Sequence, residues 1–169
     1  LIDSIGGKEA AVKRLDEMFR RLDASYGDEW FASGNEPSFQ IPWIYNWAGA
    51  PYKAQQVIRR ILNEQYSSRV NGLPGNDDLG SMGAWYVFAS IGLFPEIPGV
   101  GGFSVNSPVF RKIVLHLPEG DVIIKGGDEK KEYIQSLSLD GKKMEGTWID
   151  WSDLYRGATL EYKLSGKPD

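Results

Sequence analysis

The hydrophobic positions in the first half of the chain recur with the period of a helix. Between residues 7 and 23, apolar side chains stand three or four positions apart, with Lys, Arg and Glu between them: Val12, Leu15, Phe19 and Leu22. This spacing predicts an amphipathic helix with one buried face. Residues 24–38 are punctuated by Gly and Pro, and we expect them to form a long loop.

Three further helices are predicted before residue 92. Pro42 and Pro51 suit the first turns of a second and a third helix. The third has an apolar stripe that reaches to about Tyr66: Ala54, Val57, Ile58, Ile61 and Leu62. A fourth helix is expected from about Gly80 to Ile91, after a loop rich in Gly and Pro. Successive helices joined by loops predict antiparallel helical hairpins.

Beyond Pro98 the hydrophobic period changes from that of helices to that of strands. Alternation predicts strands near residues 113–117, 122–124, 134–139 and 159–164. The dipeptide Asp140-Gly141 is a hairpin signal between two of them. We therefore predict an α+β chain in two parts, with helical hairpins in residues 1–97 and antiparallel strands in residues 98–169.

Composition narrows the possible functions. The chain has 169 residues and a net charge of −4, with 19 basic and 23 acidic side chains, so no nucleic acid partner is expected. No stretch approaches the roughly 20 apolar residues of a membrane span. The absence of cysteine removes disulfides and Cys-ligated zinc. The one histidine, His116, lies in a predicted strand, which argues against a His-based triad within this chain.

Two loops combine Gly and Pro with carboxyl and amide side chains, and both precede a predicted helix. The sharper candidate is Gly72-Leu73-Pro74-Gly75-Asn76-Asp77-Asp78-Leu79-Gly80. Neighbouring carboxylates raise the pKa of one of the pair, so Asp77 and Asp78 are candidates for a general base. The alternative is that one of them caps the following helix by accepting backbone N–H bonds. Both roles can coexist in one pair.

The other loop, Gly34-Asn35-Glu36-Pro37-Ser38, is a candidate cation site. The amide of Asn35 and the carboxylate of Glu36 are oxygen donors that suit calcium. They would supply only two of the roughly 6–8 oxygens that calcium takes. The alternative is a polar turn with Asn35 in a left-handed conformation, stiffened by Pro37.

Aromatic residues are dense between the two loops: Trp30, Phe31, Phe39, Trp43, Tyr45, Trp47 and Tyr52. Aromatic rings stack on the C–H faces of sugars, although core packing is the expected role of at least half of them. Trp43 and Trp47 are four positions apart on a predicted helix and share a face. We take Trp43, Tyr45 and Trp47, with Asn76 beside the acidic pair, as candidate substrate-binding residues.

Several motifs occur here in the order in which they occur in glycoside hydrolase family 92. They are Gly34-Asn35-Glu36-Pro37-Ser38, Gly49-Ala50-Pro51, the run from Gly72 to Phe88, Gly92-Leu93-Phe94-Pro95, Asn106-Ser107-Pro108-Val109-Phe110, Tyr133-Ile134-Gln135-Ser136 and Gly157-Ala158-Thr159-Leu160. The sequence resembles the C-terminal third of that family over essentially its whole length.

The resemblance implies a calcium-dependent exo-α-mannosidase that inverts the anomeric configuration. Its substrates would be terminal α-mannosidic linkages, α-1,2 in particular, of N-glycans or mannans. The family fold pairs a β-sandwich with an (α/α)6 barrel. The helices of residues 1–97 would belong to the barrel, and the strands of residues 98–169 would pack as a sandwich. Carried over by motif, Asp77 and Asp78 would activate water, and Asn35 and Glu36 would lie at the calcium and sugar site. Such enzymes are exported by bacteria, so a secreted, periplasmic or cell-surface location is expected.

The sequence also departs from the family pattern. The general acid of the family is a glutamate upstream of the segment where this sequence starts, and no equivalent motif occurs here. We therefore expect a fragment that is inactive without the N-terminal remainder of the same enzyme. Phe39-Gln40 and Trp148-Ile149-Asp150-Trp151 replace patterns with histidine, which bears on linkage preference. The alternative class is a non-catalytic carbohydrate-binding or structural module, in which the acidic pair only caps.

Overall fold

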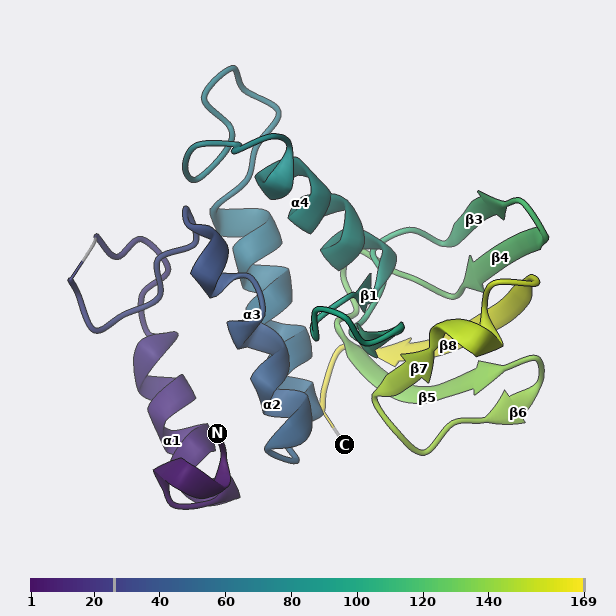
Figure 1. The fold of residues 1–169 in the computed structure, drawn as a ribbon, viewed down its shortest axis with the longest axis horizontal. Coiled ribbons are helices and arrows are strands. Elements are labelled where there is room, and N and C mark those ends of the chain that lie inside the picture. Colours follow the sequence, from purple (N-terminus) through teal and green to yellow (C-terminus); the bar gives the residue numbers. More distant parts are fainter. Residues whose placement is uncertain (26, 169) are drawn as a thin grey trace. The chain divides into compact units, whose positions relative to one another are not determined.

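The computed structural model describes residues 1–25 and 27–168, and the chain divides into two compact units (Figure 1). The first unit comprises Leu1–Val87 and the second begins at Phe88. The division falls inside helix α4 (Ser81–Ile91), ahead of the boundary after residue 97 at which the hydrophobic period changes. The last turn of α4 therefore belongs with the strands that follow it.

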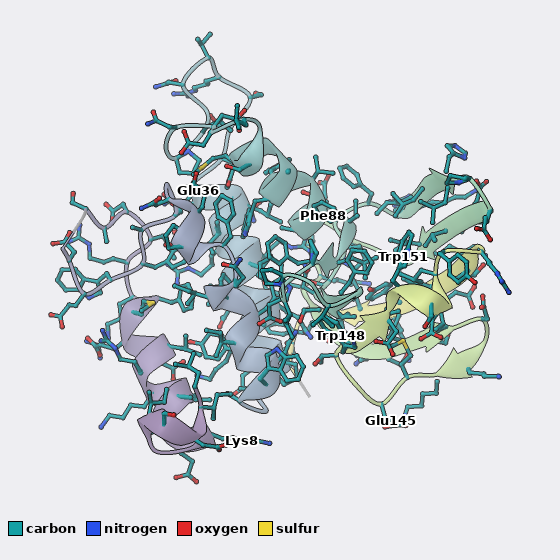
Figure 2. The ribbon with its side chains drawn as sticks, viewed as in Figure 1. Lys8, Glu36, Phe88, Glu145, Trp148 and Trp151 are labelled. Carbon is teal, nitrogen blue, oxygen red and sulfur yellow. The ribbon has the colours of Figure 1, made fainter. Side chains whose placement is uncertain are left out.

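Helix α1 (Lys8–Met18) begins close to the predicted position, at Lys8, but ends sooner than its hydrophobic stripe (Figure 2). Phe19, just beyond the helix, is still only 3% exposed. The last carbonyl groups accept tertiary hydrogen bonds, from the Phe31 N–H to Met18 O at 3.0 Å and from the Arg60 guanidinium to Phe19 O at 2.8 Å. These hydrogen bonds replace those of a further helical turn. The buried apolar positions therefore continue beyond the end of the helix.

Asp16 of α1 joins three helices of the first unit. The hydroxyl of Tyr45, on the short helix α2 (Ile44–Trp47), donates to Asp16 Oδ1 at 2.8 Å. Lys53, on α3 (Pro51–Glu64), contacts both carboxylate oxygens at 2.8 Å. Because one carboxylate receives donors from two neighbouring helices, the three helices are held in one arrangement that carries the loops of the site.

The apolar stripe predicted for α3 is buried, and α4 also buries part of its surface. On α3, Ile58 and Ile61 are each 1% exposed, and on α4 Met82 and Trp85 are 0% and 3% exposed. Three short 3-10 turns complete the first unit, at Asp3–Ile5, Glu36–Ser38 and Ile41–Trp43. The second of these turns carries one of the candidate loops.

The second unit contains two sheets. A three-stranded antiparallel sheet has the order β1-β2-β7 and a five-stranded sheet has the order β3-β4-β8-β5-β6. Their bounds are β1 Leu93–Phe94, β2 Gly102–Val105, β3 Lys112–Leu117, β4 Gly120–Lys125, β5 Tyr133–Leu139, β6 Lys142–Lys143, β7 Trp148–Asp150 and β8 Ala158–Ser165. A 3-10 turn, Trp151–Asp153, follows β7.

One strand pair differs from the antiparallel arrangement predicted for this region. β8 runs parallel to β4, with Val122 opposite Ala158 and Lys125 opposite Glu161, and antiparallel to β5. A parallel pair needs a long crossover between its strands, and the chain between β4 and β8 supplies it through β5, β6 and β7. Local alternation in the sequence does not encode which strands become neighbours, so the sheet is mixed.

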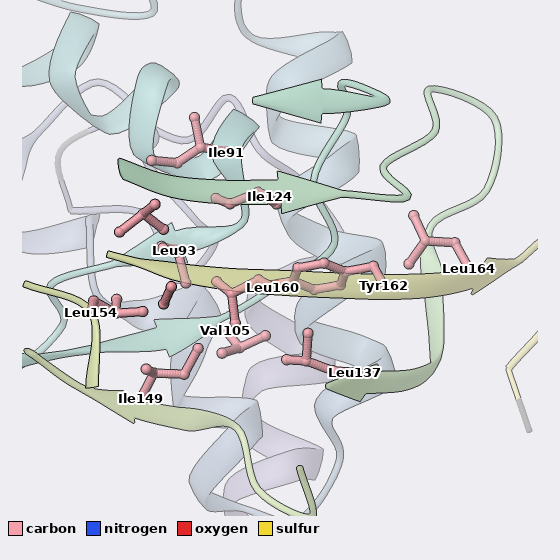
Figure 3. Close-up of a cluster of buried hydrophobic side chains, with 12 residues drawn as sticks. Ile91, Leu93, Val105, Ile124, Leu137, Ile149, Leu154, Leu160, Tyr162 and Leu164 are labelled. Atoms are coloured by element: carbon pink, nitrogen blue, oxygen red, sulfur yellow. The ribbon is translucent and has the colours of Figure 1, made fainter. Parts of the chain in front are cut away.

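The two sheets share one hydrophobic core (Figure 3). Leu93, Val105 and Ile149 come from the smaller sheet, and Ile124 and Leu160 from the larger one. β8 shows a regular alternation of buried and more exposed positions along its length, as expected of a strand with one face on a core. The packing of residues 98–169 as a sandwich stays a prediction.

The hairpin predicted at Asp140-Gly141 is confirmed. It joins β5 to β6, and φ is 48° at Asp140 and 76° at Gly141, the pair of positive values that a tight two-residue turn requires. The Asp140 carboxylate also accepts the backbone N–H of Thr159 at 2.7 Å. The short strands β1, β2, β6 and β7 were not predicted, because two to four residues are too few to display alternation.

Replacement of Leu160 tests the core of the second unit. Leu160 is 0% exposed, so Leu160→Ala should lower the free energy of unfolding by about 2–5 kcal/mol. Val100 is 49% exposed in the same unit, and Val100→Ala should leave the unfolding free energy nearly unchanged. Denaturant titration followed by far-UV circular dichroism measures both; equal effects of the two variants would contradict the assigned core.

Candidate active site

The two candidate loops touch through a pair of glycines. A Cβ atom on Gly75 would lie 2.3 Å from Gly34 O, and one on Gly34 would lie 2.5 Å from Pro74 O. Neither position has room for a side chain, since Cβ atoms do not approach other heavy atoms this closely. The contact places Glu36 beside the loop that precedes α4 (Figure 2).

Asp77 holds the start of α4. Its carbonyl accepts the Ser81 N–H at 2.7 Å and the Ser81 hydroxyl at 2.9 Å, and its Oδ1 accepts the Gly83 N–H at 3.0 Å. These are donors that a helix N-terminus would otherwise leave without partners. The capping alternative is therefore confirmed for Asp77, whose catalytic role stays a prediction.

Asp78 is directed elsewhere. The backbone takes positive φ at three successive residues, 43° at Asp78, 62° at Leu79 and 89° at Gly80. Residues other than glycine seldom adopt this region, because Cβ then crowds the backbone. The turn brings the Asp78 carboxyl to Glu36, with which it shares a side-chain hydrogen bond. An outlying backbone at a candidate catalytic residue is typical of functional sites.

The hydrogen bond between Asp78 and Glu36 has an electrostatic consequence. Two carboxyl groups can share a hydrogen bond only if one of them carries a proton. The hydrogen bond and the charge of Glu36, followed by partial desolvation and the charge of Asp77, raise the pKa of Asp78 above its ordinary value of 3.8. The folded state therefore holds a proton that the unfolded state releases at lower pH, so this pair's contribution to stability falls as pH rises through the raised pKa.

A cavity of about 540 Å³ opens beside this pair. Three of the predicted site residues line it together, Asn35, Asn76 and Asp78. Its other lining residues are Leu22, Asp23, Ala24, Ala32, Ser33, Gly34, Gln65 and Pro74. The volume lies within the range of roughly 300–1,000 Å³ typical of small-molecule sites. One residue assigned to base chemistry, Asp78, and one assigned to cation chemistry, Asn35, thus share one concave surface, whereas its lining does not include Asp77 or Glu36.

Ser33 and Gln65 are polar residues of the cavity that sequence reasoning missed. The Ser33 hydroxyl lies 3.0 Å from Gln65 Oε1 and 3.2 Å from Leu22 O. Ser33 directly precedes the loop at Gly34, which was the available signal. Gln65 directly follows the last residue of α3, and nothing in the neighbouring sequence indicates a site there.

The three candidate aromatic residues, unlike the two loops, do not line the cavity. Trp43 is 0% exposed and packs edge-on against Trp85, with ring centroids 5.8 Å apart. Tyr45 is 1% exposed, and burial together with the bond to Asp16 raises its pKa strongly. Both rings lie in the core in this conformation. Trp47 is 46% exposed, and the lining of the cavity includes none of the three.

The donor set fits a calcium ion only in part. Asn35 lines the cavity, and Glu36 and Asp78 face each other through a shared proton, which a divalent cation could replace. Within residues 1–25 and 27–168, however, no three His, Cys, Asp or Glu side chains are placed to hold a metal. The described residues would thus supply a minority of the oxygens that calcium takes.

Comparison with known proteins places the chain in a family. The profile of the glycosyl hydrolase family 92 catalytic domain matches residues 1–166, so the chain belongs to this family. A protein of Arthroderma benhamiae named as an uncharacterized secreted glycosidase is 33% identical over 170 residues, which cover 97% of this chain and 21% of that protein.

Solved structures of the family are also similar. A family GH92 α-mannosidase from Bacteroides thetaiotaomicron has a TM-score of 0.87 and 33% identity over 96% of this chain and 22% of its own. Its complex with mannoimidazole gives a TM-score of 0.88 and 31% identity over 96% of this chain and 23% of the other. A family GH92 inverting mannosidase from the same organism has a TM-score of 0.86 and 28% identity over 98% and 25%. The chain thus spans a quarter or less of these relatives.

Replacement of Gly75 tests the contact between the loops. Gly75→Ala puts a methyl group 2.3 Å from Gly34 O, so the loops must separate, and we expect a loss of stability of roughly 1 kcal/mol or more. Gly146→Ala is the matched control, because its Cβ would meet nothing within 4 Å. Thermal unfolding compares the two. If they unfold at the same temperature, the glycine contact does not hold the loops together.

Proposed function

We propose that this chain supplies the base side of the active site of an inverting exo-α-mannosidase. The substrates would be terminal α-mannosidic linkages, α-1,2 in particular, of N-glycans or mannans. One observation carries the proposal: a carboxyl group, Asp78, is turned by a left-handed backbone into a cavity and held there beside Glu36. Membership of family 92 and the similarity to family GH92 mannosidases support the choice of substrate.

In this proposal Asp78 acts as the general base. In its ionised form it takes a proton from a water molecule in the cavity as that water attacks the anomeric carbon. An inverting enzyme keeps its acid and base roughly 6.5–9.5 Å apart so that the water fits between base and sugar. Glu36 is engaged with Asp78 and so is poorly placed to protonate a leaving group. The acid would come from a part of the enzyme outside residues 1–169.

Asn35 and Glu36 would be this chain's ligands to a calcium ion. Bound calcium supplies a template and a Lewis acid for sugar hydroxyls. Asn35, Asn76, Ser33 and Gln65 have polar groups that can orient a sugar in the cavity. Water, sugar and other parts of the enzyme would complete the coordination.

The proposed enzyme has further parts. The helices of the first unit would belong to an (α/α)6 barrel, completed by the N-terminal remainder of the same polypeptide. A secreted, periplasmic or cell-surface bacterial location suits a glycan substrate, and the similar protein of Arthroderma benhamiae is named as secreted. Among the helices of the described residues, none is long and apolar enough to cross a membrane.

Asp78→Asn, made in the full-length enzyme, removes the proposed base. We expect kcat for release of mannose to fall by roughly 10²–10⁴-fold. Asp153→Asn, an exposed aspartate of the second unit, should leave kcat unchanged. Activity of Asp78→Asn equal to that of Asp153→Asn would remove the assignment of the base.

The pH profile tests the pairing of Asp78 with Glu36. The base works only when ionised, so kcat/KM should rise as pH passes the raised pKa of Asp78. Glu36→Gln removes the neighbouring negative charge and lowers this pKa, so the acidic limb of the profile should move to lower pH. An acidic limb that stays in place would show that another group controls it.

Removal of calcium tests the metal proposal. A chelator specific for calcium should abolish mannose release by the full-length enzyme, and added calcium should restore it. Asn35→Ala and Glu36→Ala should raise the calcium concentration needed for half-maximal activity, whereas Asn71→Ala, in the exposed loop after α3, should not. Full activity in the presence of chelator would refute the requirement.

A further inference from the structure

A second cavity is lined by residues in the loop that follows α3 and on α4. It has a volume of about 310 Å³ and is lined by Tyr66, Ser67, Ser68, Leu73, Gly83 and Tyr86, which we call the tyrosine pocket. All six residues belong to the first unit. The proposed reaction uses none of them, although Leu73, Gly83 and Tyr86 lie within the family motif that runs from Gly72 to Phe88.

Stacked rings form one wall of the tyrosine pocket. The Tyr66 ring lies parallel to Trp85, with centroids 5.6 Å apart and 5° between their planes. The Tyr66 ring also contacts the Tyr86 ring, with centroids 5.2 Å apart and 44° between their planes. Trp85 is fixed in turn, since its indole N–H donates to Phe39 O at 3.1 Å. Tyr86 remains 41% exposed, so an aromatic surface with a rigid support faces the solvent.

The opposite wall is a tight turn with little freedom to move. The Ser67 N–H donates to Gly72 O at 2.9 Å, and the Gly72 N–H donates to Arg69 O at 3.0 Å. A Cβ atom on Gly72 would lie 1.9 Å from Ser67 O, so only glycine permits the turn. Leu73, which follows the turn, is 42% exposed at the edge of the pocket.

The lining defines the chemistry of a ligand. It combines aromatic and aliphatic surface with hydroxyl groups from Ser67, Ser68 and two tyrosines, and it contains no charged side chain. A neutral sugar ring matches this surface, because it has an apolar C–H face for the rings and hydroxyls for hydrogen bonds. A charged ligand would lose its hydration in the pocket, and no side chain of opposite charge in the lining would compensate for that loss.

The pocket borders the proposed base through one residue. Gly83, in its lining, donates its N–H to Asp77 Oδ1 at 3.0 Å, and Asp78, the next residue, lines the catalytic cavity. The negative charge of Asp77, after burial, also contributes to a raised pKa of Tyr66. The loop of Asp77 and Asp78 therefore adjoins the linings of both cavities, and a glycan whose terminal mannose reaches Asp78 has its next residues close to this loop.

We propose that the tyrosine pocket binds a neutral sugar residue on the leaving-group side of the cleaved bond, and that Tyr86 determines the preference for longer glycans. This inference rests on the proposed function for the terminal mannose in the neighbouring cavity. Tyr86 acts on binding of the substrate beyond the scissile bond, and the chemical step at the anomeric carbon does not require it.

Two substrates separate this role from catalysis. α-Mannosyl fluoride has no sugar on its leaving-group side, whereas an α-mannotriose has two. In the full-length enzyme, Tyr86→Ala should lower kcat/KM for the α-mannotriose by roughly tenfold, mainly through KM, and change kcat/KM for α-mannosyl fluoride by less than about twofold. Tyr86→Phe keeps the ring and should stay close to wild type on both substrates.

Tyr52 provides a matched control. It is also 41% exposed and belongs to the first unit, but it does not line the tyrosine pocket. Tyr52→Ala should leave both substrates unaffected. Equal losses of Tyr86→Ala on both substrates, or the same behaviour of the Tyr86 and Tyr52 variants, would overturn the inference. A wild-type enzyme that cleaves neither substrate would instead refute the proposed function, so the two failures are distinguishable.

Discussion

The contact between Gly34 and Gly75 is the constraint on which the rest of the candidate site depends. Two loops that are far apart in the sequence meet there through backbone atoms alone, without space for a side chain on either glycine. Every further feature follows from that contact: the hydrogen bond between Asp78 and Glu36, and a cavity with Asn35 and Asn76 in one wall. In the same unit, Asp16 links α1 to α2 and α3 through Tyr45 and Lys53.

The acidic doublet divides two tasks between neighbouring residues. Asp77 satisfies the donors at the start of α4 and thereby anchors the loop. The left-handed backbone that follows then carries Asp78 away from the helix, toward Glu36. A cap and a titrating carboxyl therefore coexist in one pair. The anchored residue limits the movement of the other, which suits a group that must meet a water molecule in one position.

Much of the fold could be predicted from the sequence, because its helices and long strands have regular periods. The stripe of α3 and the alternation of β8 are examples, and Asp140-Gly141 fixed a hairpin through its turn chemistry. The early end of α1 could not be predicted from the sequence. The carbonyl groups at that end accept hydrogen bonds from Arg60 and Phe31, which are distant in the sequence. The parallel pairing of β4 and β8 could not be predicted either, because strand order depends on the whole sheet.

The candidate site was predictable where the residues themselves carry unusual chemistry. Asn35, Asn76 and Asp78 were found from their loops and do line one cavity. Gln65 and the tyrosine pocket were missed, because an amide at a helix end and an aromatic on a helix look like ordinary surface and core. Trp43 and Tyr45 show the converse: their spacing on one helix is equally compatible with packing, and they are buried.

The central place of β8 in its sheet affects how the second unit can form during synthesis. β8 follows β4 and β5 in the sequence, yet it lies between them in the sheet. Until residues 158–165 have left the ribosome, the edges of β4 and β5 have no partner between them. The nascent unit therefore keeps these two sheet edges open until β8 has been made.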